Sequence, residues 1–552
     1  MKKIMLLLML FALAVLSCKK NEKKEAQIKI RDVEVAEKLF GLEFSNAERD
    51  SMLNAVNQNL ESLNAIHKFS LENEIPPALV FNSIPRGFQP DLDSRPVHWP
   101  LPEEYTLPED RDELAFCSVA ELSVLIRTGK ISSVELTRFF LERLEKYSDT
   151  LECLVTLTPG VALEQARQAD EEISRGLYRG PLHGIPYGIK DLFAYPGYPT
   201  SWGAMPFKEQ VIDDKATVIR KLEEAGAIML GKLTLGALAM GDVWYGGKTR
   251  NPWNPEEGSS GSSAGSAAAT AAGLVPFAIG TETWGSIVSP SNRCGVTGLR
   301  PTFGRVSRAG AMALSWSMDK AGPICRSALD CGLVLQAITG EDPADTGTQP
   351  IPFNYAPITH LDTLKIAYLD YLFDSEQGNR KNDSLTLETF KELGVELQKV
   401  SLPDDIPVDA LALILNVEAA AAFDELTRSN RDDLLVRQGR NAWPNYFRQA
   451  RMIPAVEYIQ ANRLRSLLIS QVNSLFQDHD VIIAPSFGGS QLLMTNLTGH
   501  PCLVMPNGFN EKGSPTSICL LGNLFDEGML IEVARHYQLA TAYEEKHPPL
   551  FQ

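Results

Sequence analysis

The sequence is poor in histidine and cysteine, and it contains only one long apolar run. There are eight residues of each type among 552. No group of His, Asp or Glu has the spacing of a metal site, so we expect no metal ion and no cofactor. Beyond the N-terminus, no segment reaches the roughly 18 consecutive apolar residues that a membrane-spanning helix needs.

Seven cysteines follow Cys18, namely Cys117, Cys153, Cys294, Cys325, Cys331, Cys502 and Cys519. An odd number cannot all pair within one chain, and the spacings match no zinc motif and no dense disulfide framework. These residues are therefore interpreted as small buried side chains. Whether Cys325 and Cys331 pair is left open.

Positive charge is also in short supply. The chain has 52 Lys and Arg against 69 Asp and Glu, which gives a formal net charge of -17. A chain this acidic has no general attraction for phosphate backbones, so nucleic-acid binding is not expected.

The single long apolar run lies at the N-terminus. Lys2 and Lys3 precede an apolar stretch over residues 4–16, and Ser17 and Cys18 follow it. This pattern is typical of a secretory signal peptide. The small residue before Cys18 resembles the lipobox of bacterial lipoproteins, which implies removal of residues 1–17, a lipid on Cys18 and an extracytoplasmic, membrane-anchored protein. The alternative is an ordinary cleaved signal peptide with a cysteine there by chance.

Composition divides the rest of the chain into three parts. Residues 18–30 are mostly polar and indicate a solvated tether. Residues 31–111 form an N-terminal extension that begins with a helix, capped by Ser45 with Glu48, and continues with eight prolines between Pro76 and Pro108. The prolines predict an extended segment laid across a surface. Residues 112–552 are assigned to the main domain.

The main domain alternates helix and strand signals. Ser118 with Glu121 and Ser132 with Glu135 have the spacing of helix-capping boxes. Short apolar runs of strand type lie at 227–230, 277–279, 365–369 and 481–484. We therefore predict an α/β fold with a central sheet covered by helices.

Three local features carry chemistry. Residues 258–273 are rich in Gly, Ser and Ala, and their second half predicts a closely packed helix rather than a flexible linker. Within them, Gly261–Gly265 matches the G-x-S-x-G nucleophile elbow with Ser263 as nucleophile, but polar residues stand where the elbow needs a buried strand. The other features are a strand leading to Gly285 and Ser286, and Lys190 at the end of an apolar run.

Together these features resemble the amidase signature family. The matching pieces are the Lys190 region and the motifs that begin at Gly261, Gly280, Cys294 and Asp319, with 72 residues from Lys190 to Ser262 and 24 from Ser262 to Ser286. The resemblance implies a mixed, twisted sheet with helices on both faces. It also implies the catalytic set Lys190, Ser262 and Ser286, with Gly261 and Ser263 in support.

The roles implied by the resemblance are specific. Ser286 would be the acyl nucleophile, Ser262 a bridging serine after a cis peptide bond, and Lys190 the base. The backbone N–H groups of Thr283, Trp284, Gly285 and Ser286 would form the oxyanion hole. The base must be a neutral amine, so Lys190 needs a pKa lowered by about 3 units through burial.

The motif departs from the common family pattern at Glu282, Trp284 and Val288, where many members have Asp, Gly and Arg. The Trp284 ring is expected to narrow the acyl pocket or shield it from water. Three functions stay open: an amidase acting on a small or peptide-like amide, a protein similar to the A-type component of an amidotransferase, and a non-catalytic lipoprotein that uses the fold for binding. The oligomeric state is not indicated.

Overall fold

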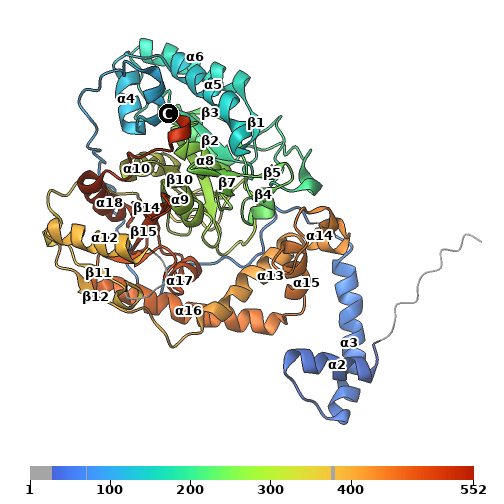
Figure 1. Cartoon of the computed structure of the whole chain (residues 1–552). Coiled ribbons are helices and arrows are strands. Elements are labelled where there is room, and N and C mark those ends of the chain that lie inside the picture. The colour runs from blue at the N-terminus through green and yellow to red at the C-terminus, as the bar shows by residue number, and fades with distance from the viewer. Residues whose placement is uncertain (1–27, 70, 374–378) are drawn as a thin grey trace, which may run out of the picture. The chain divides into compact units, whose positions relative to one another are not determined.

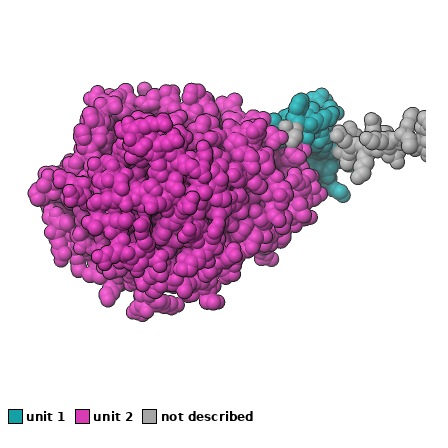
Figure 2. All heavy atoms as spheres, turned by 90° about the horizontal axis from the view of Figure 1, so that it is seen from above, with its two compact units in different colours: residues 1–71 teal, residues 72–552 magenta. Residues whose placement is uncertain are grey.

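The computed structural model describes residues 28–69, 71–373 and 379–552. The chain forms two compact units, residues 1–71 and residues 72–552, which Figure 2 shows in different colours. The predicted signal peptide and Cys18 lie outside the described residues.

In its described residues the first unit contains two helices, α2 (Ile30–Phe40) and α3 (Asn46–Ile66). Ser45 caps α3 as predicted, because its hydroxyl accepts the N–H of Glu48 and its own N–H donates to the Glu48 carboxylate. Arg49 on α3 binds the Glu37 carboxylate on α2 at 2.8 Å, which joins the two helices.

The second unit is built on a mixed sheet of eleven strands with helices around it (Figure 1). The strand order is β1-β3-β2-β8-β10-β9-β14-β15-β13-β11-β12. The bounds are β1 Leu154–Leu157, β2 Pro186–Lys190, β3 Ile228–Leu233, β8 Phe277–Glu282, β9 Thr297–Arg300, β10 Lys320–Cys325, β11 Ile366–Tyr368, β12 Gln398–Lys399, β13 Val481–Pro485, β14 Cys502–Phe509 and β15 Pro515–Gly522. Two small hairpins, β4–β5 (Val243–Trp244 and Gly247–Lys248) and β6–β7 (Arg250–Asn251 and Asn254–Gly258), lie outside this sheet.

The larger helices of this unit are α4 Val119–Arg127, α5 Ser133–Leu151, α6 Pro159–Ser174, α7 Thr217–Glu224, α8 Ala264–Ala271, α9 Val288–Cys294, α10 Ala328–Ile338, α12 Arg380–Glu392, α13 Leu413–Ala422, α15 Trp443–Ala450, α16 Ala455–Asp478, α17 Gln491–Thr498 and α18 Glu527–Thr541. The capping boxes predicted at Ser118 and Ser132 are present at the starts of α4 and α5. The α/β fold class predicted from the sequence is therefore confirmed.

Helix α8 packs directly against the middle of the sheet, on β2, β3, β8 and β10. Every residue of α8 is buried, and all of them are small. A Cβ atom on Gly265 would lie 2.4 Å from the carbonyl oxygen of Cys153, so only glycine allows this close approach. The small-residue run is thus a packed helix, as predicted, and not a linker.

The proline-rich stretch belongs to the second compact unit, which begins at Glu72, and the start of the main domain at residue 112 stays a prediction. The stretch is extended along the unit's surface, as its composition predicts. Trp99, for example, donates from its indole N–H to Gln336 at 2.7 Å and stacks on Tyr355.

All seven cysteines after Cys18 are buried with free thiols, so no disulfide joins Cys325 to Cys331. Their burial confirms the interpretation of these residues as small core side chains. Across the described ranges, no helix combines the length and the apolar character needed to cross a membrane.

Candidate active site

Lys190 is the last residue of β2 and is fully buried. Its Nζ donates to Ser262 Oγ at 2.8 Å, to Ser263 Oγ at 3.0 Å and to Thr281 Oγ1 at 2.8 Å. Burial lowers the pKa of Lys190 from an ordinary 10.5 to about 7, although Asp319 and Glu282 raise it slightly. In about half of the molecules the side chain is therefore the neutral amine near pH 7.

The sheet explains how Lys190 meets partners from distant parts of the sequence. Strands β2 and β8 are parallel neighbours, with Ile189 opposite Ile279. Their C-terminal ends therefore lie at the same edge, which puts Lys190 beside Thr281 near the end of β8. Helix α8 packs on both strands, so the loop before it carries Ser262 and Ser263 to the same place.

A second buried lysine lies nearby but is engaged differently. Lys232 on β3 forms an ion pair of 2.8 Å with Asp191, the residue after Lys190. Burial lowers the pKa of Lys232, and the Asp191 carboxylate opposes that effect. Asp191 also accepts the N–H of Ser201 at 3.0 Å. This pair fixes the end of β2 and leaves Lys190 as the amine that faces the serines.

Ser262 follows a cis peptide bond between Gly261 and Ser262. Its side chain is buried, and its Oγ is the acceptor for Lys190 described above. A Cβ atom on Gly261 would lie 1.9 Å from the carbonyl oxygen of Gly241, so no other residue type fits at this position.

Ser263 joins the three parts of the site. Its Oγ donates to the carbonyl oxygen of Thr281 and accepts the N–H of Thr281, both at 3.1 Å. Its own N–H donates to the carbonyl oxygen of Ser286 at 3.1 Å. Ser263 is fully buried. These contacts fit the supporting role expected for it and do not fit the exposed nucleophile of an elbow.

Ser286 lies on the serine loop, residues 283–286, between β8 and α9. Its side chain is 8% exposed, which makes it the most accessible member of the Lys190, Ser262 and Ser286 set. Gly285 has a φ of 82°, a left-handed conformation that favours glycine. Among the described residues, no hydrogen bond engages the N–H groups of Trp284, Gly285 and Ser286.

The Glu282 carboxylate anchors the backbone directly after the serine loop. One carboxylate oxygen accepts the N–H groups of Ile287 and Val288 at 2.8 and 3.0 Å. The other accepts from Arg300 at 2.8 Å and from the Asn496 amide at 2.7 Å. Burial would raise the pKa of Glu282, but Arg300 and these donors outweigh it and lower the pKa to about 2. In the sequence, Glu282 was noted only because many members of the family have Asp at this position. Its role in fixing the backbone after the serine loop was not predicted.

Asp319 braces the other side of the serine loop. Its carboxylate accepts from Thr283 Oγ1 at 2.5 Å and from the N–H groups of Leu314 and Ser315 at 2.8 and 2.9 Å. Burial raises the pKa of Asp319 even so. The contact with Thr283 was not predicted, because it depends on the pairing of β8 with β10.

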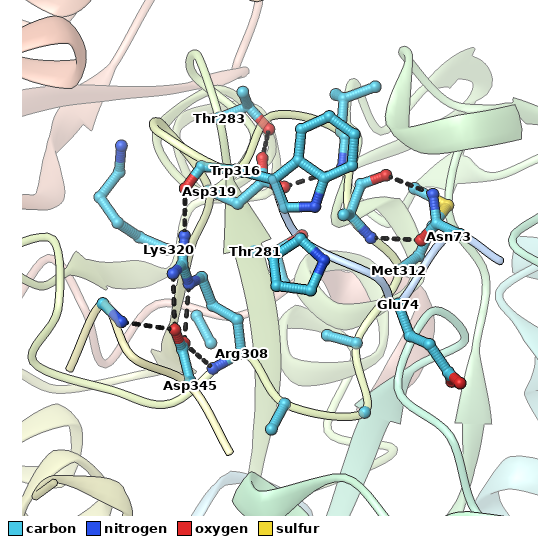
Figure 3. A pocket seen from close by; sticks show the side chains of 18 of the residues that line it. Asn73, Glu74, Thr281, Thr283, Arg308, Met312, Trp316, Asp319, Lys320 and Asp345 are labelled. Atoms are coloured by element: carbon cyan, nitrogen blue, oxygen red, sulfur yellow. Dashed lines mark hydrogen bonds and ion pairs between the residues drawn. The ribbon is translucent and has the colours of Figure 1, made fainter. Parts of the chain in front are cut away.

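A cavity of about 150 Å³ adjoins this loop, and Figure 3 shows the side chains around it. Thr281, Thr283 and Asp319 line it together with Trp316. Trp284 does not line it, and its indole is 46% exposed. The expectation that the Trp284 ring narrows the acyl pocket or shields it from water stays a prediction.

The two histidines near the motifs are packing residues. His183 is buried next to Glu172, and its Nδ1 accepts the N–H of Arg179 at 3.1 Å. His500 is buried against Thr498, and burial lowers its pKa to about 3. Within the described ranges, no three His, Cys, Asp or Glu side chains are grouped as a metal site would require.

Comparisons with known proteins agree with this geometry. The amidase family model matches residues 135–493. The A-type component of the glutamyl-tRNA(Gln) amidotransferase from Methylococcus capsulatus is 34% identical over 482 residues, which cover 78% of this chain and 98% of the relative.

Solved structures match this chain over a similar share of its length. The native peptide amidase from Stenotrophomonas maltophilia is 29% identical with a TM-score of 0.70, covering 80% of this chain and all of that one. An amidase family protein from Bacillus anthracis is 26% identical, also with a TM-score of 0.70, covering 79% and 93%. The fold, the match to the family model and these relatives establish that the chain belongs to the amidase family, whose signature enzymes act on C–N amide bonds.

Proposed function

We propose that this amidase-family hydrolase cleaves a carboxylic amide through an acyl-Ser286 intermediate, with Lys190 as base and Ser262 as proton relay. The observation that carries the proposal is the 2.8 Å contact between Ser262 Oγ and the buried Nζ of Lys190, whose pKa is about 7. A serine hydroxyl becomes a good nucleophile only when a base takes its proton.

In the proposed reaction the Ser286 oxygen attacks the amide carbon and its proton passes to the Ser262 oxygen, while the Ser262 proton passes to Lys190. The N–H groups of Thr283, Trp284, Gly285 and Ser286 stabilise the resulting oxyanion. Ser262 then donates a proton to the leaving nitrogen and takes a proton back from Lys190, and ammonia or an amine departs. Water hydrolyses the acyl-serine by the same route in reverse and releases the acid.

The neutral fraction of Lys190 and the usual rate contributions of a general base and of oxyanion donors are consistent with this mechanism. With a pKa of about 7, roughly half of Lys190 is neutral at pH 7, whereas at a pKa of 10.5 about one molecule in 3,000 would be. A positioned general base contributes about 10²- to 10⁴-fold to a rate. Each preset oxyanion donor contributes about 10²- to 10³-fold.

The second candidate is an amidotransferase component of the A type, and the similarity to the Methylococcus capsulatus protein favours it. That function requires a partner protein and a cytoplasmic location. The apolar N-terminus and the net charge of -17 favour the stand-alone amidase instead. Hydrolysis of simple amides by the purified chain, together with its presence in a membrane fraction, would decide for the amidase.

We further propose that Cys18 carries a lipid and that the protein is anchored outside the cytoplasm. The support is the apolar run before Ser17 and Cys18. Cells grown with an alkyne fatty acid should yield labelled protein, and Cys18→Ala should abolish the label and release the protein from membranes. Equal labelling of both proteins would rule the anchor out.

The expected substrate is a small or peptide-like amide, since the peptide amidase from Stenotrophomonas maltophilia shares the fold. A fluorophosphonate probe tests the mechanism and separates an enzyme from a non-catalytic binding protein. Wild type should be labelled at Ser286, and Ser286→Ala should lose the label and at least about 10³-fold of amide hydrolysis. The exposed Ser466→Ala serves as matched control. Equal hydrolysis by wild type and Ser286→Ala would reject the proposal.

A further inference from the structure

The cavity beside the serine loop is closed on one side by residues 73–81, which we call the strap. The strap precedes residues 135–493, the part of the chain that matches the family model. Its position over a cavity lined by Thr281 and Thr283 connects it to the proposed chemistry, because Thr281 contacts Lys190 and Thr283 begins the serine loop.

The strap is fixed at both ends. At one end, Asn73 Nδ2 donates to the carbonyl oxygen of Ala313 at 3.0 Å, and its Oδ1 accepts the N–H of Ala313 at 2.7 Å. At the other end, Phe81 packs edge-on against Phe303, and the Arg465 guanidinium lies 3.6 Å from the centre of the Phe81 ring. Two such anchors hold the residues between them in place over the cavity.

Those intermediate residues line the cavity while remaining open to solvent. Pro76 and Pro77 lie in an extended segment that needs no neighbouring strand, since proline has no N–H to satisfy. Leu79 is 78% exposed and Val80 is 56% exposed, yet both line the cavity. Apolar side chains so exposed contribute little to the core.

The surface that the cavity offers to a ligand is largely apolar. Its charged members are already engaged: Arg308 pairs with Asp345 at 2.7 Å, Asp319 accepts three donors, and Lys320 donates to a backbone carbonyl. The Glu74 carboxylate points away from the other labelled side chains in Figure 3. The larger apolar side chains that line the cavity away from the strap are Leu192, Phe303, Met312, Leu314 and Trp316.

We propose that this cavity binds an apolar group of the amide substrate, about the size of a phenyl ring, and that the strap limits the size of that group. An apolar cavity of about 150 Å³ holds a benzene molecule. The inference rests on the proposed function and adds to it the substrate class and a specificity element from outside the matched region.

The first test compares amides that differ only in one apolar group. One series varies the acyl side from methyl to phenylmethyl to naphthylmethyl with ammonia as leaving group. A second series places the same groups on the amine side of an acetamide. In one of the two series, kcat/KM should rise at least about tenfold from methyl to phenylmethyl and fall at least about tenfold at naphthylmethyl. Flat profiles in both series would overturn the proposal.

The second test changes the strap. The double variant Leu79→Ala with Val80→Ala, and the single variant Asn73→Ala, should each raise the naphthylmethyl-to-phenylmethyl ratio of kcat/KM at least about tenfold. Leu92→Ala and Asn82→Ala are matched controls, since these exposed residues belong to the same stretch of chain but do not line the cavity. An unchanged ratio in both strap variants would show that the strap is no part of the substrate site.

Sulfonyl fluorides separate this inference from the proposed function, because they report on Ser286 without amide turnover. Failure of wild type to react at Ser286 would reject the proposed function. Reaction of wild type at Ser286, combined with flat amide profiles in both series, would leave the function standing and reject the cavity as a substrate site. If the acyl series is the one that responds, the phenylmethane reagent should react fastest and the naphthylmethane reagent should gain in Asn73→Ala; if the amine series responds, the three sulfonyl fluorides should react at equal rates.

Discussion

Arg300 and Glu282 form a fully buried ion pair of 2.8 Å behind the serine loop. The pair has no access to solvent, and its carboxylate also accepts the N–H groups of Ile287 and Val288. It therefore links the sheet to the start of α9 and fixes the backbone on which Ser286 lies. The proposed oxyanion hole depends on this backbone being set before substrate binds.

Replacement of Glu282 by Gln should strongly lower both the stability of the fold and the catalytic rate. The glutamine side chain has the same shape as glutamate but no charge, so Arg300 loses its counter-charge. Its NH2 group also faces N–H donors that now bind a carboxylate oxygen, so at least one of those hydrogen bonds is lost. Breaking a buried pair in this way costs about 3–5 kcal/mol of the free energy of unfolding. Chemical denaturation measures this loss, and kcat should fall with it. Glu164→Gln, at an exposed pair with Arg167, should leave the denaturation midpoint unchanged.

The rate should depend on the neutral form of Lys190. Because burial lowers the pKa of Lys190 to about 7, kcat/KM should increase with pH up to about 7 and then level off, and below that pKa it should fall about tenfold per pH unit. Lys190→Ala should lower the rate at least about 10³-fold and remove this dependence. Lys512→Ala, at an exposed lysine, should keep the wild-type profile.

Thr281→Val tests which contacts set that pKa. The Thr281 hydroxyl lies 2.8 Å from Lys190 Nζ and accepts a hydrogen bond from its charged form. Loss of an acceptor disfavours the ammonium, so the pKa of Lys190 should fall and the rising part of the pH profile should move to lower pH. A shift to higher pH would contradict this account. Thr498→Val, a buried threonine away from the amine, is the control.

Trp284→Ala addresses the ring on the serine loop. Because the indole is 46% exposed and does not line the cavity, its removal should leave the relative kcat/KM values for small and large acyl groups unchanged. A broadened acyl range in this variant would instead support the expectation that the ring narrows the acyl pocket. The substrate series described above provides the measurement.

Much of the site could be predicted because its residues occur in ordered motifs. The spacing of Lys190, Ser262 and Ser286 indicated the family, and the capping boxes and apolar runs indicated the elements around them. Ser263 was expected only as a support, yet it contacts Lys190, Thr281 and Ser286. Its small buried hydroxyl has no sequence signal beyond its place in the motif.

The strap and the bracing of the serine loop could not be predicted in the same way. Asn73 and Ala313 are 240 residues apart, and Glu282 and Asn496 are 214 residues apart. Contacts at such separations follow from the strand order of the sheet, which local patterns do not encode. The prolines indicated an extended segment over a surface, but not which surface it covers.

The place of Lys190 within the sheet has a consequence for heat inactivation. Strands β2 and β8 are interior strands, with β3 and β10 on either side, so fraying at the outer strands β1 and β12 leaves the lysine and its hydroxyl partners undisturbed. Activity and folded structure should thus be lost in one cooperative transition on heating, without an earlier stage in which the sheet is intact but the enzyme is inactive.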